Sequence, residues 1–173
     1  MGTLRFFVLL LSVLFLNLFL PGNARSFSSA EGGFTVWMPG RPTLERIDHK
    51  SLVGNVKENT FTLKTKTEEF DVSFTELPGV ATTFESNKAL LTKAKDGFLK
   101  DSGAKELGFD KIPFEGKEGR ELSFQIASTD TQGKARFFLI DNILYAVVGS
   151  TTNGQKGMAL IDRFLNSFKL LPH

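Results

Sequence analysis

The sequence contains no cysteine and only two histidines among its 173 residues. Without cysteine, the chain cannot form a disulfide, a thiolate metal site, a catalytic thiol or a lipid-modified N-terminal cysteine. The two histidines, His49 and His173, do not lie in a spacing used for zinc binding or for activating a nucleophile. We therefore expect no catalytic residues, no metal site and no cofactor.

The chain also has almost no excess of positive over negative charge, since its formal net charge is only +2 at pH 7. Acidic and basic residues alternate instead of forming runs, which is typical of a solvated surface. A chain so close to neutral has no general attraction for nucleic acid or anionic lipid. Asn-x-Ser/Thr acceptor sites are absent as well, which favours a bacterial or plastid lumenal setting over eukaryotic secretion.

The one long apolar run lies near the N-terminus, from Phe6 to Leu20, directly after Arg5. Its length suits the hydrophobic region of an export signal and is short of the roughly 20 residues of a transmembrane helix. Pro21 and Gly22 then end the run ahead of the small residue Ala24. We predict a signal peptide over residues 1–24 that is cleaved after Ala24. An uncleaved membrane anchor is the alternative.

Removal of residues 1–24 leaves 149 residues, a size that suits one domain with its own core. The first of them, 25–33, are rich in Ser and Gly and are expected to form a flexible lead. Residues 34–171 are expected to form a single domain and to stay monomeric. Phenylalanine supplies most of the aromatic content and falls mainly on the apolar side of the expected strands and helices, as core residues do.

Alternation with a period of two residues predicts β-strands through most of this domain. The pattern is clearest where Phe70, Val72 and Phe74 alternate with polar residues. The predicted strands are Phe34–Met38, Thr43–Lys50, Val56–Lys66, Phe70–Leu77, Ala104–Ile112, Arg120–Ala127, Lys134–Ile140 and Ile143–Thr151. Asp141-Asn142 is predicted to join the last two as a tight hairpin, because both residue types tolerate positive φ.

Two segments have the spacing of amphipathic helices instead. In the first, Phe84, Leu91 and Phe98 share one face, Thr82 and Glu85 form a capping-box pattern at its start, and Gly103 is the expected stop. The second covers Gly154–Asn166. The element order predicts an α+β fold in which about seven or eight antiparallel strands are covered by two main helices.

Four stretches of the chain resemble the PsbP/Mog-like family, which includes PsbP-like and DcrB-like extracytoplasmic proteins. They are the opening strand and turn Phe34–Pro42, Gly119-Arg120-Glu121, the hairpin segment Asp141–Tyr145 and the closing helix segment Arg163–Phe168. The resemblance covers most of the chain after the signal peptide. It implies a PsbP-like α+β fold and a non-enzymatic accessory or binding role in a bacterial envelope or thylakoid lumen.

Five residues are candidates for a ligand or partner surface. Trp37 and Tyr145 could line a pocket between sheet and helix, with a place in the core as the alternative. Arg120 could bind a substrate or brace a neighbouring loop. Asn153 and Lys156 lie in a Gly-rich turn that leads from a strand into a helix, where backbone amides can hold an anion or simply cap the helix.

The densest acidic group consists of Glu68, Glu69 and Asp71. Without the spacing of a calcium-binding loop, we interpret these residues as solvated carboxylates beside a hairpin.

Two functions from different classes fit these observations. The first is an exported, non-catalytic accessory or protein-interaction domain, whose partner is an envelope or membrane protein. The alternative is a protein that binds a small apolar or anionic ligand beneath a helix. An enzyme is not expected, and neither is binding to nucleic acid.

The signal-peptide hypothesis predicts the mass of the exported protein. Expression of the full chain in a bacterial host should yield a protein that begins at Arg25, because a signal peptidase cuts after a small residue such as Ala24. Intact-mass spectrometry of the extracytoplasmic fraction measures this directly. A protein that keeps Met1 and stays with the membranes contradicts cleavage and supports the membrane anchor.

Overall fold

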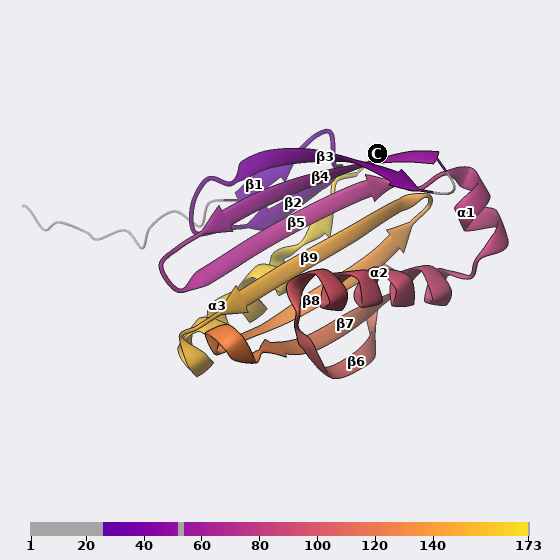
Figure 1. Ribbon diagram of the computed structural model, residues 1–173. Helices are drawn as coiled ribbons and strands as arrows, with labels where there is room; N and C mark the ends of the chain where they lie inside the picture. Colours follow the sequence, from indigo (N-terminus) through magenta and orange to yellow (C-terminus); the bar gives the residue numbers. More distant parts are fainter. Residues whose placement is uncertain (1–25, 52–53, 173) are drawn as a thin grey trace, which may run out of the picture.

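The computed structural model describes residues 26–51 and 54–172, so the predicted signal peptide lies outside the described residues. The centre of the fold is a seven-stranded antiparallel sheet with the order β3-β4-β5-β9-β8-β7-β6 (Figure 1). Its strands are β3 (Thr43–Ser51), β4 (Gly54–Lys64), β5 (Glu68–Glu76), β6 (Lys105–Phe114), β7 (Lys117–Ile126), β8 (Thr131–Ile140) and β9 (Ile143–Thr151). The predicted α+β class is confirmed.

A second, three-stranded sheet has the order β1-β2-β10 and consists of β1 (Ser26–Ser29), β2 (Phe34–Trp37) and β10 (Lys169–Leu170). The predicted strand that starts at Phe34 therefore belongs to this small sheet and not to the large one. Part of the segment expected as a flexible lead is strand β1 instead. Strand β1 pairs with β2 in an antiparallel arrangement, and the hydroxyl groups of Ser26 and Thr35 lie 2.7 Å apart.

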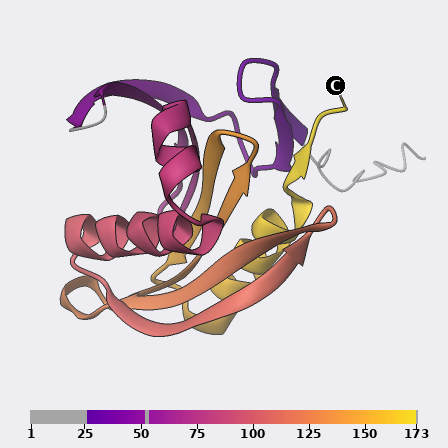
Figure 2. The same ribbon diagram turned by 90° about the vertical axis from the view of Figure 1, so that its right-hand side faces the viewer.

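The helices lie on opposite sides of the large sheet. Helix α2 (Asn87–Ser102) occupies its concave side, and helix α3 (Gly154–Ser167) lies with the small sheet on the other side (Figure 2). Helix α1 (Gly79–Phe84) links β5 to α2, and a single 3-10 turn, η1, covers Ala127–Thr129. Among the described residues, no helix is long and apolar enough to cross a membrane.

Strand alternation divides the core into two parts, one on each side of the large sheet. The α3-side core includes Phe70 and Phe138, and the α2-side core includes Phe137 and Leu122. Phe137 and Phe138 are neighbours in β8 and are each no more than 2% exposed, so both faces of this strand are buried. The predicted inward positions Phe70, Val72 and Phe74 of β5 are buried against the α3 side.

The first predicted helix starts later than its sequence pattern indicated. The N-cap of α2 is Ser86, whose Oγ accepts a hydrogen bond from the Ala89 backbone amide. Thr82 lies in the separate short helix α1 and donates from Oγ1 to the Gly79 carbonyl. The capping-box prediction at Thr82 and Glu85 was therefore wrong, because two helices meet where one was expected.

Both predicted turn signals are confirmed. Gly103 ends α2 in the left-handed conformation with φ 65°. Asp141 has φ 55° in the two-residue link between β8 and β9, where Ile140 pairs with Ile143.

Polar contacts fix the position of α3 on the sheet. Arg136 of β8 donates from Nη1 to the Leu165 carbonyl and from Nη2 to Asn166 Oδ1, both in the last turn of α3. The Arg136 Nε atom donates to Glu121 at 2.6 Å. The guanidinium thus meets free carbonyl groups and the negative end of the helix dipole.

Two glycines in different settings predict opposite effects on stability. A Cβ atom at Gly149 lies 2.6 Å from the Ile161 side chain of α3, whereas a Cβ at Gly97 of α2 has no atom within 4 Å. We expect Gly149→Ala to lower the free energy of unfolding by about 1–3 kcal/mol through overpacking. Gly97→Ala should raise it by about 0.5–1 kcal/mol, because alanine is the better helix former. Urea denaturation measures the free energy of unfolding of both variants, provided that the m-values are unchanged. Equal changes in the two variants would contradict the close contact between Gly149 and Ile161.

Candidate ligand-binding groove

The five residues that the sequence singled out do not converge on one site. Tyr145 is 3% exposed, and its Oη donates to the Gly32 carbonyl at 2.9 Å. Burial raises the pKa of this phenol. Tyr145 is therefore a core residue with a satisfied hydroxyl and lines no open pocket.

Trp37 lies at the edge of the α3-side core. Its indole packs edge-on against Phe70, and the Arg163 guanidinium covers the ring with Cζ 4.0 Å from the centroid. The Trp37 amide donates to Ser167 Oγ. These contacts hold β2 against α3, which is a structural role.

Arg120 lies on the opposite side of the large sheet from Trp37 and Tyr145, because it pairs with Phe137 of the α2-side core. Its Nη2 donates to Glu118 at 2.7 Å, and its guanidinium lies 5.9 Å from the centroid of the Phe109 ring. The bracing alternative describes this arginine better than a substrate contact does.

Asn153 and Lys156 lie at the start of α3, where the Gly-rich turn raised the possibility of an anion site. The Asn153 amide donates to Thr151 Oγ1, and Lys156 is exposed. The carboxylate of Glu68 lies at the same place, and hydrogen bonds from Thr65 above all, then from Thr67, Asn153 and Thr151, lower its pKa. A resident carboxylate repels another anion, so this arrangement favours the helix-capping alternative over an anion site.

The structure shows a different site, a groove on the concave side of the large sheet with a volume of about 580 Å³. Strands β4, β5 and β9 form its floor, and helix α2 forms one wall. The floor residues are Val56, Glu58, Thr60, Asp71, Ser73, Thr75, Leu144, Ala146 and Val148, with Phe137 at the inner end. The wall residues are Lys93, Ala94, Gly97, Phe98, Asp101 and Ser102.

The groove exists because α2 is narrower than the sheet that it covers. Its buried residues Leu90 and Leu91 belong to the α2-side core, together with side chains of β7 and β8. Its opposite flank presents Ala94 and Gly97, whose small size leaves the space beside β4 and β5 open. Because one helix cannot cover seven strands, a groove remains whose floor is apolar along β9 and mostly polar along β4 and β5.

Asp71 is the exceptional group in this groove. It lies on β5 between Thr62 of β4 and Val148 of β9, and its Oδ1 accepts a hydrogen bond from Thr62 Oγ1 at 2.6 Å. Burial raises the pKa of this carboxyl to about 6, with a smaller contribution from the neighbouring Glu69 carboxylate. Asp71 therefore changes its charge close to neutral pH, inside a mainly apolar pocket.

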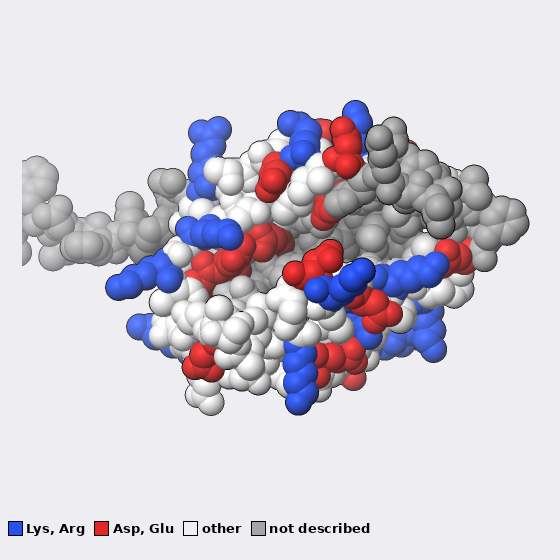
Figure 3. Space-filling model, in the orientation of Figure 1, with Lys and Arg blue, Asp and Glu red and all other residues white. Residues whose placement is uncertain are grey.

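The groove has more acidic than basic side chains. Glu58, Asp71 and Asp101 line it, and Lys93, the one basic residue among its described lining residues, forms an ion pair with Glu85 at 2.6 Å. Figure 3 shows this side of the molecule, with Asp and Glu side chains gathered along the middle of the face. The electrostatic character of the groove is therefore acidic.

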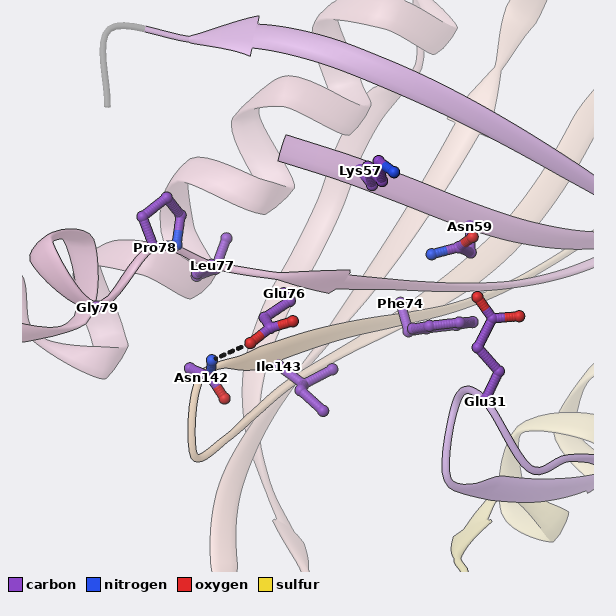
Figure 4. A pocket seen from close by; sticks show the side chains of 10 residues that line it. All are labelled: Glu31, Lys57, Asn59, Phe74, Glu76, Leu77, Pro78, Gly79, Asn142 and Ile143. Atoms are coloured by element: carbon purple, nitrogen blue, oxygen red, sulfur yellow. Dashed lines mark hydrogen bonds between the residues drawn. The ribbon is translucent and has the colours of Figure 1, made fainter. Parts of the chain in front are cut away.

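A second cavity, of about 730 Å³, lies on the other side of the sheet near the end of β5 (Figure 4). Three of its polar side chains, Asn142, Glu76 and Glu31, already have partners. Asn142 donates from Nδ2 to Glu76 at 2.9 Å, and Glu31 forms an ion pair with Arg46 at 2.8 Å. The groove beside α2 is the better candidate site, because binding pockets are mostly apolar with a few converging polar groups.

Comparison with known proteins supports the fold assignment. No protein-family model matches the sequence, and no curated protein does. The solved structure of cyanobacterial PsbP (CyanoP) from Synechocystis sp. PCC 6803 is similar, with a TM-score of 0.60 and 15% identity over 84% of this chain and 91% of that chain. The chain therefore has a PsbP-like fold, as the resemblance implied.

Another similar structure is PA94 from Pseudomonas aeruginosa, a protein of unknown function. Its TM-score is 0.42 and its identity 15%, over 78% of this chain and 99% of that chain. We draw no argument from this likeness.

The sequence interpretation missed Asp71 as a site residue. It grouped Asp71 with the solvated carboxylates Glu68 and Glu69, and that interpretation was wrong for Asp71. The available signal was alternation, because Asp71 lies between Phe70 and Val72 on a central strand, where the opposite face is also covered.

The raised pKa predicts a pH dependence of stability that originates from Asp71. Its folded-state value of about 6 exceeds the reference value of 3.8, so the native state binds this proton more tightly than the unfolded state does. Stability therefore falls as pH rises between about 4 and 6. Asp71→Asn keeps an acceptor for Thr62 and should remove this dependence, with a gain of about 2 kcal/mol at pH 7.5 after allowance for solvent screening.

Denaturant titrations of both proteins from pH 4 to pH 8 measure the difference. Thr62→Val is the matched variant, because loss of its hydrogen bond should move the window to higher pH. Parallel profiles for wild type and Asp71→Asn contradict a raised pKa at this position.

Proposed function

We propose that this chain is an exported, non-catalytic accessory protein that works by holding a small ligand in the groove beside α2. The observation that carries the proposal is the groove itself, whose volume of about 580 Å³ lies in the range of small-molecule sites. Its floor combines Leu144, Ala146 and Val148 of β9 with the partly buried carboxyls of Asp71 and Glu58. An apolar floor supplies affinity, and one charged group orients the ligand.

Export is the part of the proposal that comes from the sequence. The apolar run and the small residues before Arg25 have the order of a signal peptide. A cysteine-free domain suits an oxidising compartment, since it has no thiol to oxidise. Together with the PsbP-like fold, these features support a place in a bacterial envelope or a thylakoid lumen.

A docking domain for an envelope or membrane protein is the second candidate, and one observation favours it. Strand β3 is an edge of the large sheet, and its Leu44 and Ile47 are 37% and 41% exposed. Ile47 pairs with Glu58, which lines the groove, whereas Leu44 pairs with Phe61 of the α3-side core, so the edge exposes one apolar side chain on each face. Exposed apolar groups at an unpaired edge are a common feature of protein interfaces.

Native mass spectrometry of protein purified from its own host tests the proposal. The wild-type protein should carry an additional small mass, and Gly97→Leu should not, because leucine fills the groove from a position with free space. Gly97→Ala is the matched control and should keep the ligand. A wild-type spectrum without any added mass refutes the ligand-binding proposal, and an added polypeptide supports the docking candidate instead.

A further inference from the structure

The groove holds a carboxyl whose hydrogen-bonding capacity is only partly used. One oxygen of Asp71, Oδ1, accepts the 2.6 Å hydrogen bond from Thr62. An ionised carboxylate has two oxygens and about four acceptor positions. Because Asp71 lines the groove, its remaining capacity is directed to whatever enters that space.

The cations near Asp71 already have partners within the chain. Lys64 of β4 forms an ion pair with Glu69 at 2.9 Å, and Lys93 of α2 forms one with Glu85. The other charged residues of the groove, Glu58 from β4 and Asp101 from α2, are acidic like Asp71. Lys64 lowers the pKa of Asp71 electrostatically, but among the described residues no ion pair joins a lysine or arginine to this carboxyl.

We propose that the groove binds a small amphipathic amine, with its apolar chain on the floor beside α2 and its protonated nitrogen at Asp71. The inference rests on the proposed ligand-binding function and specifies its chemistry. It replaces the expectation of an apolar or anionic ligand, because the groove is acidic and lies away from Trp37, Tyr145 and Asn153.

The physical argument is charge complementarity in a partly desolvated pocket. A charge-assisted hydrogen bond is stronger than a neutral one, and burial strengthens it further. An ammonium group at Asp71 favours the ionised carboxylate and so opposes the desolvation that raises its pKa. A carboxylate ligand is repelled by the ionised Asp71 instead. The length of the apolar floor, from Val148 to Leu144 along β9, suits an alkyl chain.

A pH dependence follows from the same geometry. Binding should weaken as pH falls through about 6, where Asp71 takes up a proton while an alkylamine stays charged. The charged groups that face this carboxyl are Lys64 and Glu69 on the sheet and Asp101 and Lys93 on α2, with Glu58 further along the floor. Both lysines have carboxylate partners, so Asp71 is the group whose titration changes the net charge available to the ligand.

The test compares three probes that share an eight-carbon chain: n-octylammonium, n-octanol and n-octanoate. Each is titrated at pH 7.5, below its aggregation concentration, into protein purified after expression of the full chain. Shifts of the Leu144, Ala146 and Val148 methyl resonances report binding. The affinity for octylammonium should be at least about tenfold higher than that for octanol, and octanoate should bind most weakly. At pH 5 the preference for the amine should disappear.

Two substitutions test whether the preference for octylammonium over octanol depends on Asp71. Asp71→Asn should bring octylammonium to the affinity of octanol and leave octanol unchanged, since the apolar floor is intact. Asp110→Asn is the matched control, because it removes a carboxylate of β6 that does not line the groove and should keep the preference. A preference that survives Asp71→Asn overturns the inference.

The outcomes separate this inference from the function on which it rests. If the wild-type protein binds octylammonium and octanol with equal affinity, recognition of an amine is refuted, whereas the proposal of a ligand-binding groove stands. Absence of binding for all three probes refutes both. Gly97→Leu should abolish every binding response, and binding that persists in this variant places the probes outside the groove and overturns the inference.

Discussion

Both faces of the seven-stranded sheet bury apolar side chains, and the elements packed on one face extend over more strands than those on the other. On one side, α3 and the three-stranded sheet together cover phenylalanine-rich strands, and Phe70 and Val72 of β5 are fully buried. On the other side a single helix, α2, covers mainly β7 and β8. The remaining floor beside β4 and β5 is the groove. The candidate site is thus a consequence of how the fold distributes its covering elements, and its walls are rigid secondary structure.

Asp71 shows the tension between stability and function in this arrangement. A carboxyl on the central strand β5 costs folding energy at neutral pH, because the native state must hold it partly out of water. An amide or hydroxyl of similar size at this position would avoid that cost. Strained or costly groups concentrate at functional sites, so the cost itself is an argument that the group serves binding.

Sequence patterns predicted the fold well because local rules decide most of it. Alternation located the strands, Gly103 ended the helix and Asp141-Asn142 formed the hairpin. The site was not predictable in the same way, since Asp71, Phe98 and Val148 come together only through sheet order and the position of α2. Tyr145 and Trp37 occupy the core or core-edge positions that the sequence offered beside a pocket, because aromatic residues with a polar end serve either setting.

The small sheet joins the two ends of the folded domain. Strand β10 pairs with β2, with Lys169 opposite Thr35, and Phe168 packs against the buried ring of Phe34. The three-stranded sheet is therefore complete only when residues 169–170 pair with β2, more than 130 residues away in the chain. The position of β2 against the large sheet therefore depends on segments from both ends of the described domain.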